Sequence, residues 1–256
     1  MYLIDYNSYR SVKGFSRRVR FLVMHYTAID FKASVTALTG SSVSAHYLIP
    51  DPSEKTYIDA GFKDMRIFNL VDENERAWHA GVSSWSGRSN LNDTAIGIET
   101  VNLATENNNI FIFPPYNPEQ IEAIKALATN ILQRYPDITP TNVVGHSDIA
   151  PGRKSDPGAA FPWKALYDAG IGAWYQESTM QNYLAQFSRT QPAKADIIAK
   201  LKTYGYDTSD AGTDNGYKNL IRAFQLHFRQ KNYDGIADAE TAAILYALVD
   251  KYFPGK

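Results

Sequence analysis

The feature that most constrains the fold is an almost uninterrupted apolar run near the N-terminus. Between residues 18 and 27 this run contains Val19 and the apolar residues 21–24. Apolar residues without alternation, over the length of a strand, are typical of a central β-strand that is covered on both faces. A second short run, Val143 and Val144, precedes a loop rich in Gly and Pro. These runs therefore indicate buried strands of a central β-sheet.

Helix and strand signals fill the space between these runs. Asp30 is expected to cap a helix that ends at Gly40, and Asn117 is expected to start a helix that Pro136 stops. Residues 51–64 are polar and are expected to form a loop. Further strands are expected at residues 44–49, 66–71 and 95–101.

The composition changes in the last third of the chain. Residues 181–194 include Pro192 and have little apolar content around it, so they are interpreted as a linker. Three helical segments follow, at residues 195–204, 217–228 and 239–253. The prediction is therefore a domain at residues 1–180, a linker at 181–194, and a small all-α three-helix bundle at 195–256.

The net charge, the cysteine count and the lengths of the apolar runs exclude several classes of protein. A formal net charge of −1 leaves no basic surplus to neutralise phosphates, so nucleic acid is not expected as a partner. The chain has no cysteine, which excludes thiol nucleophiles, thiolate zinc sites and disulfides. No stretch has the length of a membrane span, and residues 1–20 lack the apolar run of a signal peptide.

Polar side chains occur where the predicted buried strands end. His25 ends the first apolar run, and His146 follows Val143 and Val144 after one glycine. Glu99 shares a strand face with Gly97, and a carboxylate there is costly unless that face opens to a cleft or a cation. The alternative for each histidine is a core residue with satisfied hydrogen bonds, and His227 in the helical bundle is expected to be a packing or surface residue.

These residue types together suit zinc. A catalytic zinc site takes three protein ligands and leaves one position for water, and two imidazoles with a carboxylate fit that ion. His25, His146 and Asp156 are therefore the candidate ligands of one Zn²⁺ per chain. The helical motif His-Glu-x-x-His is absent, so the fold must bring them together. With Glu99 as general base and Lys154 as a donor to a developing oxyanion, the set predicts a metal-assisted amide hydrolase.

Five sequence motifs, in this order, resemble those of zinc N-acetylmuramoyl-L-alanine amidases of the AmiD/AmpD branch. These amidases share the fold of phage-lysozyme-type amidases and peptidoglycan-recognition proteins, which implies an α/β fold with a central mixed β-sheet flanked by helices. The motifs lie at residues 21–27, 44–47, 77–81, 92–99 and 145–158. The resemblance covers roughly residues 1–180, and residues 224–241 resemble the three-helix peptidoglycan-binding module that some of these enzymes carry.

The resemblance implies specific roles and a reaction. It makes His25, His146 and Asp156 the zinc ligands, with Glu99 and Lys154 at the positions of the catalytic acid and lysine. Four further positions match motif residues that would line the substrate cleft: His46, Trp78, His79 and Asn92. The implied reaction is hydrolysis of the amide between the lactyl group of N-acetylmuramic acid and L-alanine of the stem peptide. Peptidoglycan and muropeptides, 1,6-anhydro forms among them, would be the partners.

Other readings of these residues stay open. A non-catalytic peptidoglycan-recognition protein has the same fold, and a zinc peptidase that cuts within the stem peptide would use the same chemistry. Trp85 follows Trp78 and His79 in a region expected to be loop, where tryptophans either form an exposed platform or clamp the loop to the core. The wall-binding module favours the periplasm or cell-wall space by an export route that the sequence does not reveal, with the cytoplasm as the alternative.

Overall fold

The central β-sheet of the predicted α/β fold is present in a computed structural model, which describes residues 2–107 and 110–255. The strand order is β3-β2-β6-β1-β9. Strands β2, β6, β1 and β9 run parallel to their neighbours, whereas β3 is antiparallel, so the sheet is mixed as predicted. The strand bounds are β1 Phe21–Tyr26, β2 Tyr47–Ile49, β3 Phe68–Asn69, β6 Ala95–Thr100 and β9 Val143–Gly145.

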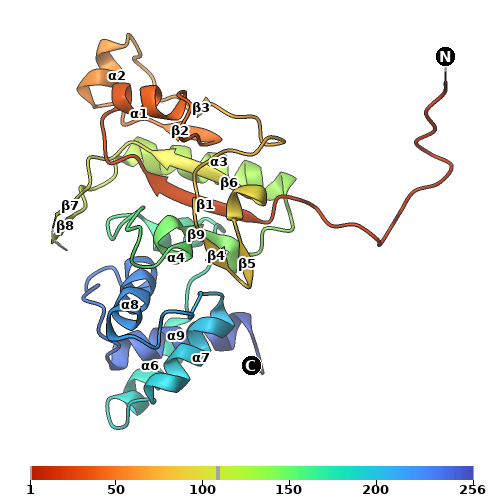
Figure 1. Cartoon of the computed structure of the whole chain (residues 1–256). Coiled ribbons are helices and arrows are strands. Elements are labelled where there is room, and N and C mark those ends of the chain that lie inside the picture. Colours follow the sequence, from red (N-terminus) through yellow and green to blue (C-terminus); the bar gives the residue numbers. More distant parts are fainter. Residues whose placement is uncertain (1, 108–109, 256) are drawn as a thin grey trace.

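Helices flank this sheet (Figure 1). Helix α1 (Phe31–Leu38) begins after Asp30, whose side chain accepts a hydrogen bond from the N–H of Ala33. Helix α3 (Pro118–Arg134) begins with a capping box in which the side chains of Asn117 and Gln120 satisfy backbone N–H groups. Its apolar residues join the core under the sheet. Both predicted helices are confirmed.

The segment at residues 51–64 was predicted as a loop, and this was wrong in part. It contains the short helix α2 (Lys55–Asp59), capped by Glu54, whose carboxylate accepts hydrogen bonds from the N–H groups of Thr56 and Tyr57. Glu is not among the preferred N-cap residues, so the start of this helix carries no ordinary sequence signal. Its Tyr57 is fully buried in a second apolar cluster beneath α1.

Two small hairpins were not predicted. Strands β4 (Ser84–Trp85) and β5 (Arg88–Ser89) form one, and β7 (Thr105–Asn107) and β8 (Ile110–Ile112) form the other. Their strands are too short for a periodic pattern to show. Two 3₁₀ turns, at Leu91–Asp93 and Pro140–Asn142, precede β6 and β9.

The C-terminal part of the chain is helical. Its helices are α4 (His146–Ile149), α5 (Trp163–Asp168), α6 (Glu177–Phe187), α7 (Lys194–Tyr204), α8 (Asp214–Phe228) and α9 (Ala239–Tyr252). The predicted linker at residues 181–194 is only partly one, because residues 181–187 belong to α6. Apolar side chains of α6, among them Met180 and Phe187, are buried against α9, which explains why this segment is ordered. We call α7–α9 the helical module.

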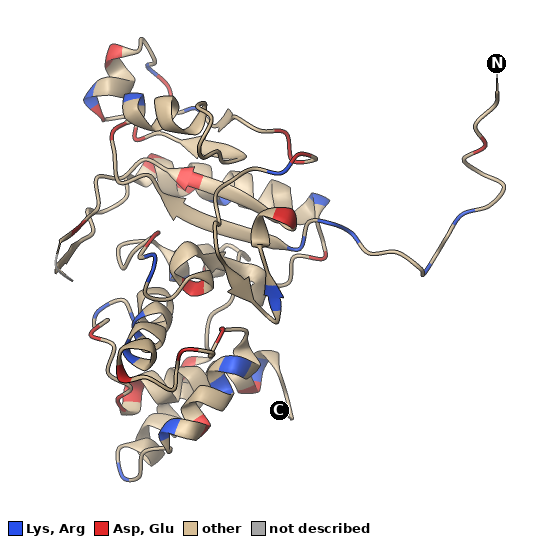
Figure 2. Cartoon of the chain, in the orientation of Figure 1, with Lys and Arg blue, Asp and Glu red and all other residues tan. Residues whose placement is uncertain are grey.

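The sheet and the helical module share one apolar core. A single buried cluster runs from Leu22 and Ile96 of the sheet to Phe224 of α8 and Leu248 of α9. Charged residues lie mainly outside it: Figure 2 shows β1 and β9 without Lys, Arg, Asp or Glu, and β6 with a single acidic residue. Within residues 2–107 and 110–255, no helix combines the length and the apolar character that a bilayer crossing requires.

Candidate metal centre

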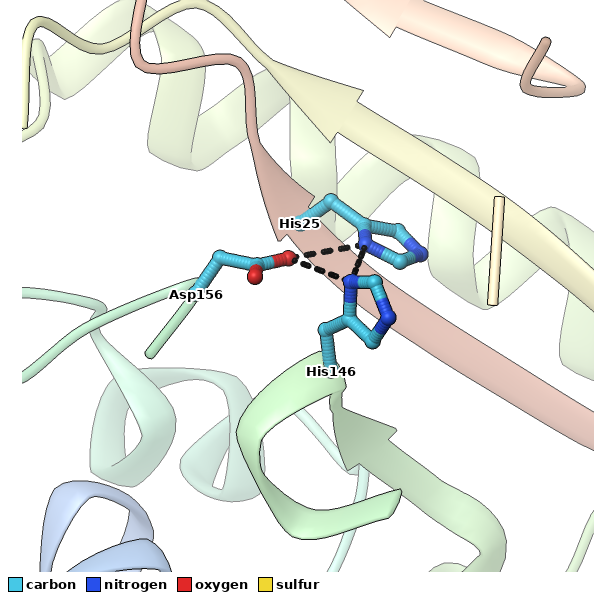
Figure 3. Close-up of side chains that lie close together, drawn as sticks. All are labelled: His25, His146 and Asp156. Atoms are coloured by element: carbon cyan, nitrogen blue, oxygen red, sulfur yellow. Dashed lines mark hydrogen bonds and ion pairs between the residues drawn. The ribbon is translucent and has the colours of Figure 1, made fainter. Parts of the chain in front are cut away.

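Three predicted ligands meet at one edge of the sheet (Figure 3). The Nδ1 atoms of His25 and His146 lie 3.0 Å apart, and Oδ2 of Asp156 lies 2.8 Å from the first and 3.1 Å from the second. All three side chains are buried. The structure thus brings together three residues that are 10 to 131 positions apart in the sequence.

The sheet topology explains this meeting. His25 lies in β1, and His146 is the first residue of α4, directly after β9. Strands β1 and β9 are parallel neighbours, so their carboxyl ends lie at the same edge. The loop after α4 then turns back, and the carbonyl of Asp156 accepts a hydrogen bond from the N–H of Ser147 at 2.8 Å. This bond holds Asp156 beside the two rings.

Hydrogen bonds on the far side of each ring orient the lone pairs. Nε2 of His146 lies 3.0 Å from the carbonyl oxygen of Ala80, which can only accept, so that nitrogen carries a proton. Nε2 of His25 lies 3.0 Å from Nδ1 of His79 and carries the proton if it is the donor. A ring that is protonated only at Nε2 leaves its Nδ1 lone pair available to a cation, and both Nδ1 atoms lie beside the same oxygen of Asp156.

The protonation states favour a cation at the centre of this triangle. Burial lowers the pKa of His25 to about 4, although the nearby carboxylate of Asp156 opposes the shift. Burial raises the pKa of Asp156, but the neighbouring rings of His146 and His25 outweigh it and hold that pKa well below its usual range. At neutral pH, His25 is therefore neutral and Asp156 is ionised, as metal ligation requires.

The spacing of the three atoms fits zinc. Zinc lies about 2.0–2.2 Å from N and O ligands, so two tetrahedral ligand atoms are separated by roughly 3.3 Å. The observed separations of 2.8, 3.0 and 3.1 Å are slightly shorter. Small outward movements of the side chains would accommodate the ion.

A cleft of about 370 Å³ opens over His146 and Asp156, and Glu99 and Lys154 also line it. Glu99 lies in β6 opposite His25 of β1. Its Oε2 is buried and has no hydrogen-bond partner among the described residues. Burial and the charge of Asp156 raise the pKa of Glu99 well above its usual range, whereas the cationic Lys154 lowers it. A carboxylate with a raised pKa is suited to exchange protons near neutrality.

Trp78 and His79 also line the cleft, but in different ways. Trp78 is 51% exposed at its mouth. His79 is buried against the backbone of Gly97, where an added Cβ would lie 2.5 Å from the ring Cγ. Burial lowers the pKa of His79 well below its usual range. Besides lining the cleft, His79 is hydrogen-bonded to His25 and so orients a candidate ligand.

His46 and Asn92 were expected to line the cleft, and in this structure neither is among the described residues that do. Nδ1 of His46 accepts a hydrogen bond from the N–H of Gly97 at 3.0 Å. Oδ1 of Asn92 accepts hydrogen bonds from the N–H groups of His79 and Ala80. Both side chains are hydrogen-bonded to backbone N–H groups, which would otherwise be buried without partners.

Two expectations outside the sheet edge are also resolved. Of the two alternatives for Trp85, an exposed platform or a clamp on the core, the structure favours the clamp: the side chain is 1% exposed and its Nε1 donates to the carbonyl of Thr141. It clamps the β4–β5 hairpin onto the core. His227 is buried in the helical module, as expected for a packing residue, and its Nδ1 is hydrogen-bonded to Asp148.

Sequence reasoning missed several residues around the cleft. Tyr26 Oη donates to Ser155 Oγ at 2.7 Å, and Ser155 in turn donates to Glu106. Arg153 donates to the carbonyls of Ala80 and Val82. It thereby fixes the loop segment whose Ala80 carbonyl is the partner of His146 Nε2. Tyr26, Arg153 and Ser155 all lie within the quoted motifs, so their positions beside His25 and Asp156 were the available signal. Glu106 lies on the unpredicted β7–β8 hairpin and had none.

Residues 15–159 match the family described as N-acetylmuramoyl-L-alanine amidase. The chain is 45% identical to N-acetylmuramoyl-L-alanine amidase AmiD of Escherichia coli over 237 residues, which cover 92% of this chain and 84% of that protein.

Solved structures give the same picture. AmpDh3 from Pseudomonas aeruginosa is 60% identical, covers 98% of this chain and 99% of its own, and superimposes with a TM-score of 0.95, both alone and in a complex with anhydromuramic pentapeptide. AmiD from E. coli, in complex with the substrate anhydro-N-acetylmuramic acid-L-Ala-D-gamma-Glu-L-Lys, is 43% identical with a TM-score of 0.84, covering 95% of this chain and 93% of that one.

Proposed function

The chain belongs to the N-acetylmuramoyl-L-alanine amidase family, and from this premise we propose that His25, His146 and Asp156 hold one Zn²⁺ ion at its active site. The protein is a hydrolase of the amide bond between the lactyl group of N-acetylmuramic acid and L-alanine. The observation that carries the metal assignment is the buried triangle of two Nδ1 atoms and one carboxylate oxygen, with 2.8–3.1 Å between them.

The residues around the triangle divide the work of hydrolysis. A zinc ion held there would supply Lewis acidity and a water whose pKa falls to about 7. Glu99, whose Oε2 is unpartnered in the cleft, would accept the proton of the attacking water and return it to the leaving nitrogen. Lys154, at the cleft wall, would donate to the oxyanion that forms on the attacked carbonyl.

The substrate would enter the cleft as a muramyl peptide. The two close relatives of known structure are complexed with anhydromuramyl peptides, which supports 1,6-anhydro muropeptides as ligands of this chain. Trp78 presents a half-exposed ring at the cleft mouth, where it would pack against the sugar or the stem peptide.

The helical module, α7–α9, would bind the peptidoglycan polymer. A second cleft of about 460 Å³ lies between this module and the sheet domain. Hydroxyl, amide and carboxylate groups line it, among them Ser84, Asp207 and Asn215. Such groups suit a hydrated polymer of sugars and peptides. A polymer-binding module would place the enzyme in the periplasm or cell-wall space.

Product analysis tests the proposed function. The zinc-loaded chain is incubated with a purified anhydromuramyl tetrapeptide, and the products are identified by mass spectrometry. Release of anhydro-N-acetylmuramic acid and an intact tetrapeptide is expected. Cleavage within the peptide would contradict the assigned bond, and activity that survives complete metal removal would contradict the metal assignment.

Binding and location are tested separately. The full-length Glu99→Gln variant should sediment with purified sacculi, and substitution of Asn215 by Ala should weaken this without changing hydrolysis of the small substrate. Cell fractionation should find the chain in the periplasmic fraction; recovery only with the cytoplasm would overturn the proposed location.

A further inference from the structure

Asp148 is a fully buried carboxylate two residues after the candidate ligand His146. Its Oδ2 accepts a hydrogen bond from the N–H of Gly145 at 2.7 Å. Gly145 precedes α4, and His146 is the first residue of that helix. The carboxylate therefore closes the turn of backbone from which the His146 side chain emerges.

The other hydrogen bonds to Asp148 come from the C-terminal helical region. Tyr206 Oη donates to Oδ1 at 2.6 Å, and Nδ1 of His227 donates to Oδ2 at 2.7 Å. Tyr206 follows α7, and His227 lies in the last turn of α8. The match to the amidase family ends at residue 159, so both donors lie outside the region that defines the family.

Both donors are held rigidly. The ring of His227 stacks between Trp163 and Phe228, with centroids 3.8 and 3.9 Å away. The ring of Tyr206 packs edge-on against Trp85 at 4.7 Å. Neither side chain can turn away from Asp148 without disturbing these contacts.

Helix α8 also contacts the loop on the other side of His146. Asn219 packs against Gly152 so closely that an added Cβ on that glycine would lie 2.4 Å from its Nδ2. The next residue, Arg153, donates to the carbonyl of Ala80. That carbonyl is the partner of His146 Nε2, so both the backbone and the ring of His146 are braced by groups in contact with the helical module.

We infer that the helical module positions the metal ligand His146, with Tyr206 and His227 as positioning residues that act through Asp148. This inference rests on the proposed metal site. A buried carboxylate that loses its donors is costly, so α4 would shift until Asp148 found water or other partners. His146 would move with it. The module is then part of the metal site as well as a binding unit for the polymer.

Zinc affinity of full-length variants tests the inference. The variants Tyr206→Phe, His227→Phe and the double variant are titrated with zinc against a chromophoric chelator, and the absorption spectrum of the cobalt-loaded form is recorded. Loss of a group that orients a ligand weakens metal affinity by about 10- to 100-fold. We expect each single variant to bind zinc roughly tenfold more weakly than the unmodified chain and to show an altered cobalt spectrum. His227→Asn, which keeps a donor near the position of Nδ1, should recover part of the affinity.

Tyr204→Phe is the matched control, because Tyr204 is a buried neighbour whose ring lies 6.2 Å from that of Tyr206. Its zinc affinity should equal that of the unmodified chain. Unchanged affinity and spectrum in Tyr206→Phe and His227→Phe, with only the melting temperature lowered, would overturn the inference and leave a packing role. If the double variant does not fold, the zinc affinity and cobalt spectrum of Tyr206→Phe, which removes only one hydroxyl, decide the test. Failure of the unmodified chain to bind zinc would instead contradict the proposed metal site.

Discussion

His25 and Glu99 are direct neighbours across the parallel strands β1 and β6, with their Cα atoms in register. Side chains in register on adjacent parallel strands lie on the same face of a sheet. A candidate metal ligand and a candidate general base are thus held side by side by backbone hydrogen bonds. Their relative position does not depend on a mobile loop.

This register separates two functions that mutation can distinguish. Glu99→Gln should retain zinc, because Glu99 is not one of the three clustered ligand groups. It should lower kcat by about 10²- to 10⁴-fold, the usual contribution of a general base. Zinc content and steady-state kinetics measure the two effects. Glu106→Gln, which changes another carboxylate lining the cleft, is the control and should stay within about tenfold of the unmodified enzyme. Near-normal activity of Glu99→Gln would refute its role as base.

The ligand residues should behave differently from Glu99. His25→Ala or Asp156→Ala should abolish both zinc binding and hydrolysis, because each removes one of three ligand atoms. Thermal or chemical unfolding provides an independent readout. Zinc at about 100 times its Kd stabilises a folded protein by about 2.7 kcal/mol, and the variants should lose this gain. Chelation should inactivate the unmodified enzyme, and added zinc should restore it. A zinc-dependent stabilisation that persists in either variant would exclude that residue as a ligand.

Gly97 should tolerate no side chain because of His79. An added Cβ would lie 2.5 Å from the His79 ring, which is hydrogen-bonded to His25. Gly97→Ala should therefore destabilise the fold by about 1–3 kcal/mol, as overpacking does, and weaken zinc binding. Gly212→Ala is the control, since no atom lies within 4 Å of the Cβ that it would add. Urea unfolding and zinc titration measure the effects. Wild-type affinity in Gly97→Ala would show that His79 does not orient His25.

Acidification should destabilise the metal-free protein through His46. Burial lowers the pKa of His46 below its ordinary value of 6.5, so the folded state keeps the ring neutral. As the pH falls below 6.5, the unfolded chain takes up this proton before the folded protein does, and the free energy of unfolding decreases. The loss ends once the pH passes the lowered pKa.

His46→Asn isolates this contribution. Its Oδ1 can still accept from the N–H of Gly97, but it does not titrate. Measured by urea unfolding between pH 7.5 and 5.5, the free energy of unfolding should fall less steeply in the variant than in the unmodified chain. Equal slopes would mean that His46 is protonated alike in the folded and unfolded states.

Much of the architecture could be predicted from local patterns. The apolar run before His25 indicated a central strand, and the Asn-Pro-Glu-Gln signal at residues 117–120 indicated the start of α3. These patterns are readable because burial on two faces and helix capping act on residues close in sequence. Helix α2 was not predicted because its cap is a glutamate. Residues 181–187 were mistaken for linker because the apolar surface that buries this part of α6 belongs to α9.

By itself, the sequence determined the fold class and the family, and it indicated the three candidate ligands that the structure brings together, since the strand ends carry His25 and His146 and the turn carries Asp156. Only the tertiary structure decided what lies around each polar or aromatic side chain. It turned His46 and Asn92 toward buried backbone groups, clamped Trp85 into the core, and joined His227 to Asp148. The physical reason is that periodicity tells which face of an element a residue occupies, whereas its hydrogen-bond partner belongs to another element tens of residues away.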